Sequence, residues 1–382
     1  MSPSCSIGPL YIPGLSICSN LTVLILLLSI ILAGYLIALI ALYLPEKAVD
    51  DPKQWPSISI WVAARNEEAS ILACLESLDQ LDYPHEQVEI ILGDDGSEDR
   101  TAEIVKDFIS TKNQFRYLFI DGKLGKADKK ANVLAHLAHA SNGDYYLICD
   151  ADIQVKPTWA MELVKNFTGN TGVVSATTLI ADTSWFARMQ RIDWLYLMGL
   201  LKSAANLGIP CTAVGNNMAV SKEAYWATGG YENIDFSITE DFKLFRAIIE
   251  KGYGWKHLNN AASTSLSAPV PDFRTLLAQR KRWLIGGREL PLYWKLLLGL
   301  HASFDPLILV LLFFQLPLAL ILFVGRIFLQ VLLILRLFKR IDEKPPRLLL
   351  ILEYPAFSAS LSVCSLVFYL LPKGKEWKAR KY

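Results

Sequence analysis

The sequence predicts an α/β domain, with a mostly parallel sheet and flanking helices, joined to transmembrane helices near both ends of the chain. Two observations lead to this fold class. Short apolar runs alternate with helix-length segments between residues 57 and 150, which is typical of βαβ units and a parallel sheet. Hydrophobic residues make up 52% of the chain and charged residues 20%, and the apolar excess near the ends indicates membrane helices.

Three apolar stretches are long enough to cross a bilayer core of about 30 Å. Residues 21–44 contain no charged residue and predict the first transmembrane helix, after a segment of residues 1–20. Residues 306–338 predict one or more further transmembrane segments, and residues 348–371 predict the last. The intervening residues 45–270 carry most of the charge and are long enough for one domain with a sizeable core.

Basic residues predict the orientation of these segments. Lys47 and Lys53 follow the first span closely, so the central domain is expected in the cytoplasm and the N-terminus outside. The basic tail of residues 372–382 suits an anionic leaflet and also favours the cytoplasmic side. We therefore expect a multi-pass protein of the plasma or inner cell membrane, with the lipid bilayer as a partner.

The number of passes stays open. If residues 306–338 form a hairpin and residues 348–371 cross once, the C-terminus lies outside, against the charge of its tail. One long broken pass followed by another places the tail inside but leaves the basic residues between the two passes outside. A third alternative is that residues 348–371 re-enter around Pro355.

Four strands and three helices are expected in the first half of the central domain. Strands and helices alternate along residues 57–63, 65–81, 88–93, 99–110, 115–120, 127–140 and 144–149. Asn66 is expected to cap the first of these helices. Three of the strands end in polar clusters, and polar groups gathered at one edge of a parallel sheet favour a ligand site.

Cysteine usage and net charge narrow the class of protein further. The six cysteines include no C-x-x-C pair, and Cys149 lies in a predicted core strand, so reduced thiols are expected instead of a disulfide framework. The net charge of +1 gives no indication of a nucleic-acid partner, and none is expected.

Asp150 and Asp152 directly follow the fourth predicted strand. In open α/β sheets, ligands bind outside the carboxyl ends of the strands. Two acids one residue apart repel each other unless a cation lies between them, and Mg²⁺ or Mn²⁺ prefers oxygen ligands and often also binds substrate phosphates. The alternative is a solvated acidic loop, which the position after a hydrophobic strand disfavours. We therefore expect a metal–diphosphate site here.

Asp94 and Asp95 end the second predicted strand. A carboxylate at this position can accept the imide N–H of uracil, a donor that cytosine lacks. A turn through Gly96 and Ser97 would explain those two residues but not two adjacent acids. The pair therefore predicts a nucleoside-binding site.

Six motifs occur in the order seen in membrane-bound family 2 glycosyltransferases, and the chain resembles that family, which includes cellulose, chitin and hyaluronan synthases and ceramide glucosyltransferase. The motifs are VAARNEE (62–68), DDGS (94–97), GK (125–126), DAD (150–152), TED (239–241) and QRKRW (279–283). Each motif alone is weak, but six in order over residues 57–287 form a specific signal. The resemblance implies a GT-A-like, Rossmann-like domain that uses a nucleotide-sugar donor.

The resemblance also implies roles in donor binding. Acids at the positions of Asp94 and Asp95 hold the nucleoside in the family, and Asp152 is the more direct metal ligand, with Asp150 beside it. The same resemblance extends the expected donor contacts to Ala64, Asn66 and Glu67.

Lys126 is the lysine expected to contact the diphosphate. A lysine is a compact point charge suited to phosphates, and the family places one in a G-K element at this position. Lys123 is a competitor. Lys129 and Lys130 are expected to be solvated residues of the following helix.

Asp241 is the expected catalytic base. An acceptor alcohol is a poor nucleophile while protonated, and the family pattern gives the task of removing its proton to this carboxylate. The alternative is helix capping, because acids in a first turn favour the helix dipole. The two roles can coexist, with Glu240 supporting the helix beside the acceptor and diphosphate.

Gln279, Arg282 and Trp283 are expected to share one helix face, because they stand at i, i+3 and i+4. An amide, a guanidinium and an indole can form a platform for an acceptor sugar and a clamp for phosphate. The alternative is an amphipathic interfacial helix within residues 271–300, and both interpretations can apply together. Asn216, near the end of a predicted strand, is a further candidate for contact with sugar hydroxyls, although a turn explains it equally well.

These residues predict an inverting, metal-dependent transfer of a sugar to a hydroxyl of a membrane lipid or of a lipid-linked or growing glycan. The expected donor is a nucleotide-sugar, with a UDP-sugar preferred. One alternative is a subunit of a processive polysaccharide synthase, which would need a larger transmembrane bundle. Another is a non-catalytic membrane protein that senses nucleotides. The presence of Asp152, Asp241 and Arg282 argues against this second alternative.

Overall fold

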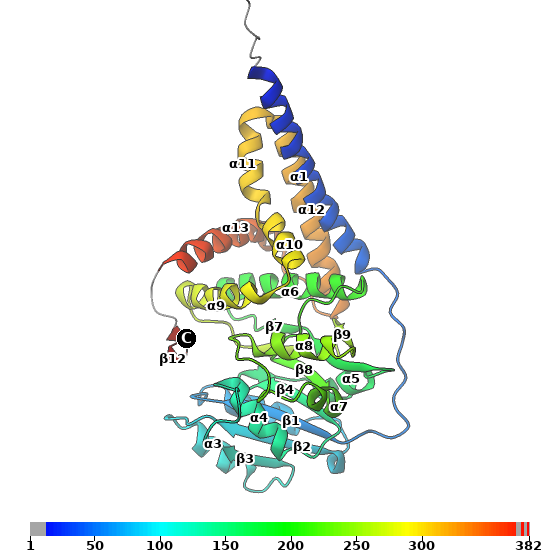
Figure 1. Ribbon diagram of the computed structural model, residues 1–382, viewed down its shortest axis with the longest axis vertical. Coiled ribbons are helices and arrows are strands. Elements are labelled where there is room, and N and C mark those ends of the chain that lie inside the picture. Colours follow the sequence, from blue (N-terminus) through cyan, green and yellow to red (C-terminus); the bar gives the residue numbers. More distant parts are fainter. Residues whose placement is uncertain (1–12, 372–375, 378–379, 382) are drawn as a thin grey trace, which may run out of the picture. The chain divides into compact units, whose positions relative to one another are not determined.

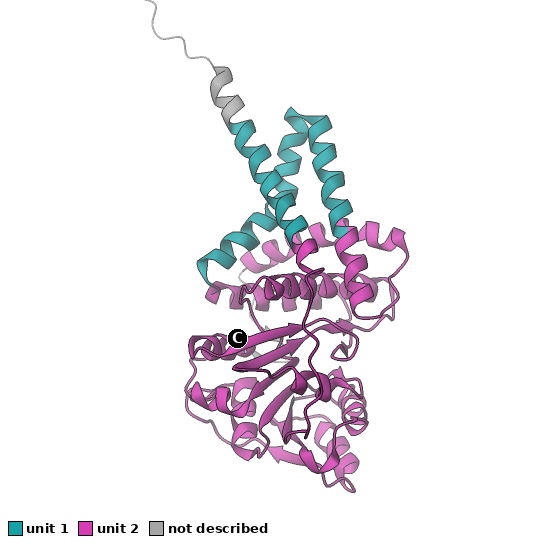
Figure 2. Cartoon of the chain, turned by 90° about the vertical axis from the view of Figure 1, so that its right-hand side faces the viewer, with its two compact units in different colours: residues 1–37, 291–330 teal, residues 38–290, 331–382 magenta. Residues whose placement is uncertain are grey.

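The computed structural model (Figure 1) divides the chain into two compact units, which Figure 2 distinguishes by colour. The residues that it describes are 13–371, 376–377 and 380–381. Unit 1 and unit 2 comprise, respectively, residues 1–37 with 291–330, and residues 38–290 with 331–382. The expected outer segment of residues 1–20 and the basic tail of residues 372–382 lie mostly outside the described residues.

Unit 2 is built on a seven-stranded mixed sheet with the order β3-β2-β1-β4-β8-β6-β9. These strands are β1 Ile58–Ala64, β2 Val88–Asp94, β3 Phe115–Phe119, β4 Tyr145–Asp150, β6 Thr171–Ala176, β8 Asn217–Ser221 and β9 Gly254–Leu258. Only β8 runs antiparallel to its neighbours, β4 and β6, among the strands described in this sheet. The predicted fold class, a mostly parallel sheet with flanking helices, is confirmed.

Helices cover both faces of this sheet. One face carries α2 Ile71–Asp79, α3 Thr101–Ile109 and α5 Trp159–Lys165, and the other carries α4 Lys130–Ala140, α7 Lys222–Ala227 and α8 Glu240–Glu250. A small second sheet joins β5 Ile153–Gln154, β10 Ser265–Ser267 and β7 Thr178–Ile180. Short 3-10 helices occupy His85–Gln87 and Gly287–Glu289.

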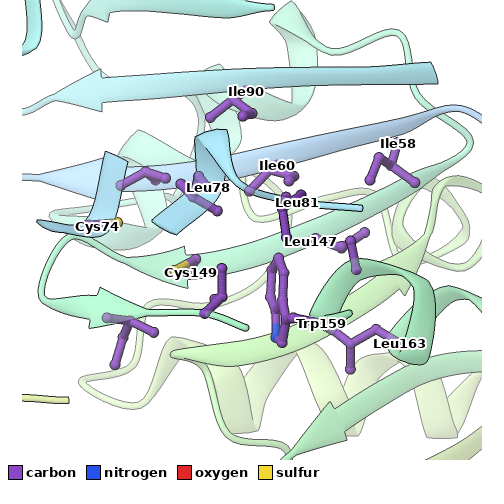
Figure 3. Packing of buried hydrophobic residues seen from close by; sticks show 14 of the residues in the cluster. Ile58, Ile60, Cys74, Leu78, Leu81, Ile90, Leu147, Cys149, Trp159 and Leu163 are labelled. Atoms are coloured by element: carbon purple, nitrogen blue, oxygen red, sulfur yellow. The ribbon is translucent and has the colours of Figure 1, made fainter. Parts of the chain in front are cut away.

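Strand β1 supplies side chains to a hydrophobic core on each face. Ile58 and Ile60 pack into one core, where Figure 3 shows them near Trp159. Trp61 points to the opposite face and stacks on Tyr146, with ring centroids 4.4 Å apart. Because successive side chains alternate between faces and both faces are buried, β1 is an almost continuous apolar run.

Two predicted helices begin later than expected. The helix predicted from Arg65 begins at Ile71, because Asn66 adopts a left-handed φ of 53° and binds the loop after β2. The Asn66 N–H donates to Ser97 Oγ at 3.0 Å, and its Oδ1 accepts from the Glu98 N–H at 2.9 Å. Asn66 therefore joins two loops and does not cap a helix. The helix predicted from residue 127 begins at Lys130.

Three further helices of unit 2 lie together on one side of the sheet (Figure 1). They are α6 Trp185–Asn206, α9 Phe273–Gly286 and α13 Leu348–Leu370. Near the start of α13, the Tyr354 hydroxyl donates to Asp193 Oδ1 of α6 at 2.9 Å. Just past its end, the Leu371 carbonyl accepts from Lys281 Nζ of α9 at 2.9 Å. Both ends of α13 therefore contact helices of the same unit.

The C-terminal half of α6 also contacts the last turns of two apolar helices, α1 Pro13–Ala41 and α12 Leu316–Arg340. Ser203 Oγ and Asn206 Nδ2 donate to carbonyl oxygens in the last turn of α1, at 2.9 and 2.8 Å. Gly199 lies against Leu337 of α12, and a Cβ at this glycine would come within 2.2 Å of the leucine side chain. A glycine is needed here because the two helices approach so closely.

By length and composition, three described helices can cross a membrane: Asn20–Ala41, Leu316–Arg340 and Leu348–Leu370. A fourth candidate is the pair α10 Leu292–Ala302 and α11 Phe304–Phe314, which is bent by 43°. Within unit 1, Arg326 of α12 is an ion-pair partner of Asp305. This charge, which interrupts an apolar stretch of the sequence, is therefore paired inside the unit.

Candidate active site

A cavity of about 520 Å³ lies at the carboxyl-terminal edge of the sheet in unit 2. Its walls come from the ends of β1, β2 and β4, from residues 214–216 before β8, and from the start of α4. Residues 236–241, residues 267–271, α6 and α9 complete the walls. The polar clusters that follow the predicted strands therefore meet at one cavity, as expected for an open α/β sheet.

Asp150 and Asp152 both line the cavity, at the end of β4 and directly after it. Lys130, the first residue of α4, places its Nζ 2.5 Å from Asp150 Oδ1 and 3.1 Å from Glu240 Oε1. The expectation of a solvated Lys130 is wrong. Because α4 begins three residues later than predicted, this lysine stands at the helix end that forms the cavity wall.

The charges around Lys130 are unbalanced in favour of acids. Burial alone would lower the pKa of Lys130, but the carboxylates of Asp150 and Glu240 raise it above its usual value, so the lysine stays charged. Asp152 and Asp241 also line the cavity. Asp150, Glu240 and Asp241 all act on the one ammonium group of Lys130, and this excess of carboxylates favours binding of a further cation.

Asp241 is the second residue of α8 and lies against the chain before β8. Its Oδ2 accepts from the Gly215 N–H at 2.8 Å, and its Oδ1 accepts from the Phe242 N–H at 2.8 Å. A Cβ at position 215 would lie 2.6 Å from the Asp241 Cβ, so a glycine is needed at this contact. Burial, together with the charge of Glu240, raises the pKa of Asp241 to about 6.

Asp94 and Asp95 have different environments in the structure. Asp94 is buried and accepts from the Tyr117 hydroxyl at 2.6 Å and from the Ser97 hydroxyl at 2.7 Å. Among the described residues that line the cavity, Asp95 is present and Asp94 is not. Asp94 thus shapes the loop after β2, and Asp95 is the carboxylate of the pair that lines the cavity.

Two of the three other expected donor contacts line the cavity, namely Ala64 and Glu67. Asn66 joins the two loops as described above and is not among the lining residues that the structure describes. Arg65 lines the cavity as well and donates from Nη1 to the Asp95 carbonyl at 2.7 Å. Arg65 lies inside the first motif, so its sequence position was the available signal.

Lys126 is not among the described residues that line this cavity. Its Nζ is 2.8 Å from Asp235 Oδ1, and both side chains are exposed. Lys126 therefore ties its own loop to the segment that leads into α8. Contact with a diphosphate at Lys126 stays a prediction, whereas Lys130 lines the cavity.

Gln279, Arg282 and Trp283 all line the cavity on α9, as does their neighbour Arg280. The guanidinium of Arg280 lies over the ring of Trp283, with Cζ 4.2 Å from the centroid, and is an ion-pair partner of Asp193. Asp193 also accepts from Tyr354, so α6 and α13 together hold the α9 motif in place.

Asn216 lines the cavity, and its Oδ1 accepts from the Thr178 hydroxyl at 2.9 Å. Asn217 is fully buried, with Oδ1 accepting from Trp159 Nε1 and Nδ2 donating to the Thr177 carbonyl. The expected strand end is instead the start of β8, which runs antiparallel beside the end of β4. That reversal brings Asn216 to the same edge as Asp150.

Trp194 of α6 is a cavity residue that no motif indicated. Its ring lies 4.9 Å from that of Trp283, centroid to centroid. Nothing in the local sequence distinguishes Trp194 from an ordinary helix residue, because its position depends on the packing of α6 against α9.

The described residues contain no group of three or more His, Cys, Asp and Glu side chains arranged to hold a metal ion. Asp150 and Asp152 nevertheless offer two carboxylates at one edge of the cavity. A Mg²⁺ or Mn²⁺ ion held by one or two carboxylates usually completes its shell with water and substrate phosphates, so this donor set fits such an ion.

Comparison with known proteins finds two matching family models and a solved structure with a similar fold. The glycosyl transferase family 2 model matches residues 59–229, and the glycosyl transferase family group 2 model matches residues 145–371. A mannosyltransferase from Pyrobaculum calidifontis, solved with GDP-Man and Mn²⁺, shares the fold, with a TM-score of 0.57 at 16% identity over 92% of this chain and 99% of that one.

Two curated relatives are similar in sequence. Poly-beta-1,6-N-acetyl-D-glucosamine synthase of Staphylococcus epidermidis is 28% identical over 248 residues, which are 63% of this chain and 58% of the relative. Beta-monoglucosyldiacylglycerol synthase of Trichormus variabilis is 28% identical over 273 residues, or 69% and 57%. The chain thus spans less than three fifths of these relatives. Since the second family model covers more than half of the chain, the protein belongs to glycosyl transferase family group 2.

Proposed function

We propose that this enzyme transfers a sugar from a UDP-sugar to a hydroxyl of a membrane lipid or of a lipid-linked or growing glycan, with inversion at the anomeric carbon. The observation that carries the proposal is Asp241, a carboxylate in the cavity wall with a pKa raised to about 6. Such a group is mostly ionised at neutral pH and is basic enough to accept a proton from an acceptor hydroxyl.

The reaction is a single displacement. Asp241 takes the proton of the acceptor hydroxyl while the oxygen of that hydroxyl attacks the anomeric carbon. The bond between this carbon and the diphosphate oxygen breaks, and its electron pair leaves with UDP. Because attack and departure occur on opposite sides of the carbon, configuration inverts without a covalent sugar–enzyme intermediate.

Positive charge at the donor end stabilises the leaving diphosphate. Lys130 holds an ammonium group beside Asp150, in the part of the cavity nearest the end of β4. Asp150 and Asp152 would hold Mg²⁺ or Mn²⁺, which when bound supplies Lewis-acid stabilisation of the diphosphate. Asp95 and Arg65, at the ends of β2 and β1, are positioned to bind the nucleoside.

The similarity to relatives named as a polysaccharide synthase and as a glycolipid synthase supports both acceptor classes at this level. Processive synthesis with export stays an alternative, although three or four candidate spans in the described chain are few for an export channel. A cytoplasmic position of the cavity is part of the proposal and rests on Lys47 and Lys53 after the first apolar helix.

Release of UDP by the purified protein in detergent tests the proposal. A panel of UDP-sugars is offered with Mn²⁺ or Mg²⁺, or with EDTA, and host lipid extract serves as acceptor. We expect metal-dependent release from one donor and a loss of about 100-fold or more in Asp241→Asn, which removes the base but keeps the shape of the side chain.

Glu250→Gln is the matched control, because Glu250 is an exposed carboxylate at the far end of the same helix. It is expected to release UDP at the wild-type rate. Equal activity of Asp241→Asn and wild type would remove Asp241 from catalysis. Nucleotide binding without turnover in the wild type would favour the sensing alternative.

A further inference from the structure

Helices α6 and α9 run side by side in the same direction through the wall of the cavity. At their first turns, the rings of Phe186 and Phe273 lie 6.5 Å apart. One turn further along α6, the Gln190 side chain makes two hydrogen bonds to the backbone of Val270, at 3.0 and 3.1 Å. Farther on, Trp194 lies beside Trp283 in the cavity itself. The two helices thus connect their first turns to the cavity.

The first turns of these helices, together with one residue of α13, form an aromatic cluster that consists of Trp185, Phe186, Phe273 and Phe357. Phe357 of α13 is 6.2 Å from Trp185 and 6.3 Å from Phe186, between ring centroids. Trp185 is 51% exposed and Phe273 is 36% exposed. Exposed aromatic rings gathered at one place mark a surface that meets another apolar phase.

Helix α13 extends this surface with residues of the same kind. Leu349, Glu353 and Phe357 share one helix face because they are spaced by four residues. Leu349 is 70% exposed, and Glu353 accepts from Trp185 Nε1 at 2.9 Å. The exposed Arg347 stands directly before this helix. Apolar residues and tryptophan flanked by a basic residue are typical of the membrane–water interface.

Contacts at the other end of α6 also indicate a position close to the membrane–water interface. As described above, Ser203 and Asn206 bond to the last turn of α1, and Gly199 packs against α12. These are the ends of two helices that by length and composition can cross a membrane, and such helix ends are expected at the bilayer surface. Helix α6 has 22 residues and is about 33 Å long, so it links these contacts to the aromatic cluster at its opposite end.

We propose, building on the function proposed above, that the acceptor is a membrane lipid that reaches Asp241 along α6 and α9. Its hydroxyl-bearing headgroup lies between the Trp194–Trp283 pair and Asp241, and its acyl chains stay against the aromatic cluster. A soluble glycan would gain nothing from exposed apolar side chains at the mouth of this route, whereas a lipid keeps its chains in an apolar surrounding.

The test compares a lipid acceptor with its own headgroup in water. The full-length protein is reconstituted in phosphatidylcholine vesicles that contain diacylglycerol or a hexosyl diacylglycerol. Glycerol, methyl hexoside and a soluble oligosaccharide are the water-soluble acceptors. For the double variant Trp185→Ala/Phe273→Ala, we expect kcat/KM for the vesicle lipid to fall about tenfold, and that for the matching soluble headgroup to fall much less.

Leu72→Ala is the control, because Leu72 is an exposed apolar residue on α2, on a different element of unit 2. It should leave both values unchanged. Preferential transfer to the soluble oligosaccharide overturns the inference, as does an equal loss for both acceptors in the double variant. Transfer to no lipid, host lipid extract included, also overturns it. Release of UDP without acceptor is followed in parallel, so that failure of the glycosyl transfer itself is recognised separately.

Discussion

Two ion-paired lysines, the half-buried Lys130 and the buried Lys202, have similar partners but different environments. Lys130 lies in the cavity between Asp150 and Glu240. Lys202 lies inside α6, where its Nζ is 2.8 Å from Glu46 Oε2 and donates to the His257 carbonyl at 2.9 Å. The first lysine is surrounded by more acids than cations. The second shares its only ion-paired carboxylate, within the described residues, with Arg340.

The pKa values of the two groups reflect this difference. Carboxylates raise the pKa of Lys130 against the effect of burial, whereas burial lowers the pKa of Lys202. Burial and the nearby Lys202 also lower the pKa of His257 to about 3, so this histidine stays neutral. A cluster with excess carboxylates can bind another cation or a charged substrate, whereas in the Lys202 cluster the one carboxylate is already shared by two cations and links helices α6 and α12.

Among the variants that test this comparison of the two lysines, the largest expected effect is that of Lys130→Met, which removes the ammonium group between Asp150 and Glu240. Without it, carboxylates face the leaving diphosphate, and we expect the rate of sugar transfer to fall roughly 100-fold. Steady-state release of UDP measures this. Lys251→Met, at the exposed end of α8, is the control and should retain full activity. A rate within about twofold of wild type in Lys130→Met would show that this ammonium group has no part in the transfer.

The sequence predicted the edge of the sheet better than the individual contacts. The strands before Asp95 and Asp150 are short apolar runs that end in acids. The position of these carboxylates at the strand ends therefore follows from the apolar runs alone. Asp241 follows from its motif and from the helix that begins beside it. Such features depend on residues that are close together in the chain.

The remaining contacts depend on details that neighbouring residues do not reveal. Lys126 and Lys130 differ in role because α4 begins only at Lys130, which leaves Lys126 in the preceding loop and places Lys130 at the helix end that lines the cavity. The Asp94 carboxylate accepts a hydrogen bond from Tyr117, which lies on the neighbouring strand β3. Trp194 reaches the cavity only through the packing of α6 on α9. These outcomes are tertiary and leave little local signal.

A smaller loss is expected for Gly215→Ala, which tests whether the position of a carboxylate matters as much as the charge around it. The added Cβ would lie 2.6 Å from the Asp241 Cβ, so the base must move. A displacement of about 1 Å can cost up to 100-fold, and we expect a loss of roughly 10- to 100-fold in kcat. Gly287→Ala is the control, because the nearest atom to its Cβ would be 3.9 Å away. Equal kcat values for the two variants would contradict the proposed contact.

The pH profile sharpens the account of the cavity cluster. Asp241 must be deprotonated to act as a base, so kcat/KM should rise as the pH increases through about 6 and then level off. The charge of Glu240 is one cause of this raised pKa. Glu240→Gln should therefore move the rising limb to lower pH, with an effect below tenfold at any one pH. An unchanged limb in this variant would mean that another group controls the profile.

The smallest effect on activity is expected for Lys202→Met, because the Lys202 cluster stabilises the fold without lining the cavity. Methionine fills much of the same volume, and Glu46 keeps Arg340 as a partner. The lost charged hydrogen bonds should lower the free energy of unfolding by about 1–2 kcal/mol, partly offset by the apolar side chain. A lower thermal midpoint in detergent, with transfer rates within about twofold of wild type, is the expected result. A loss of activity as large as that of Lys130→Met, at an unchanged midpoint, would instead show that α6 couples the ends of α1 and α12 to the chemistry.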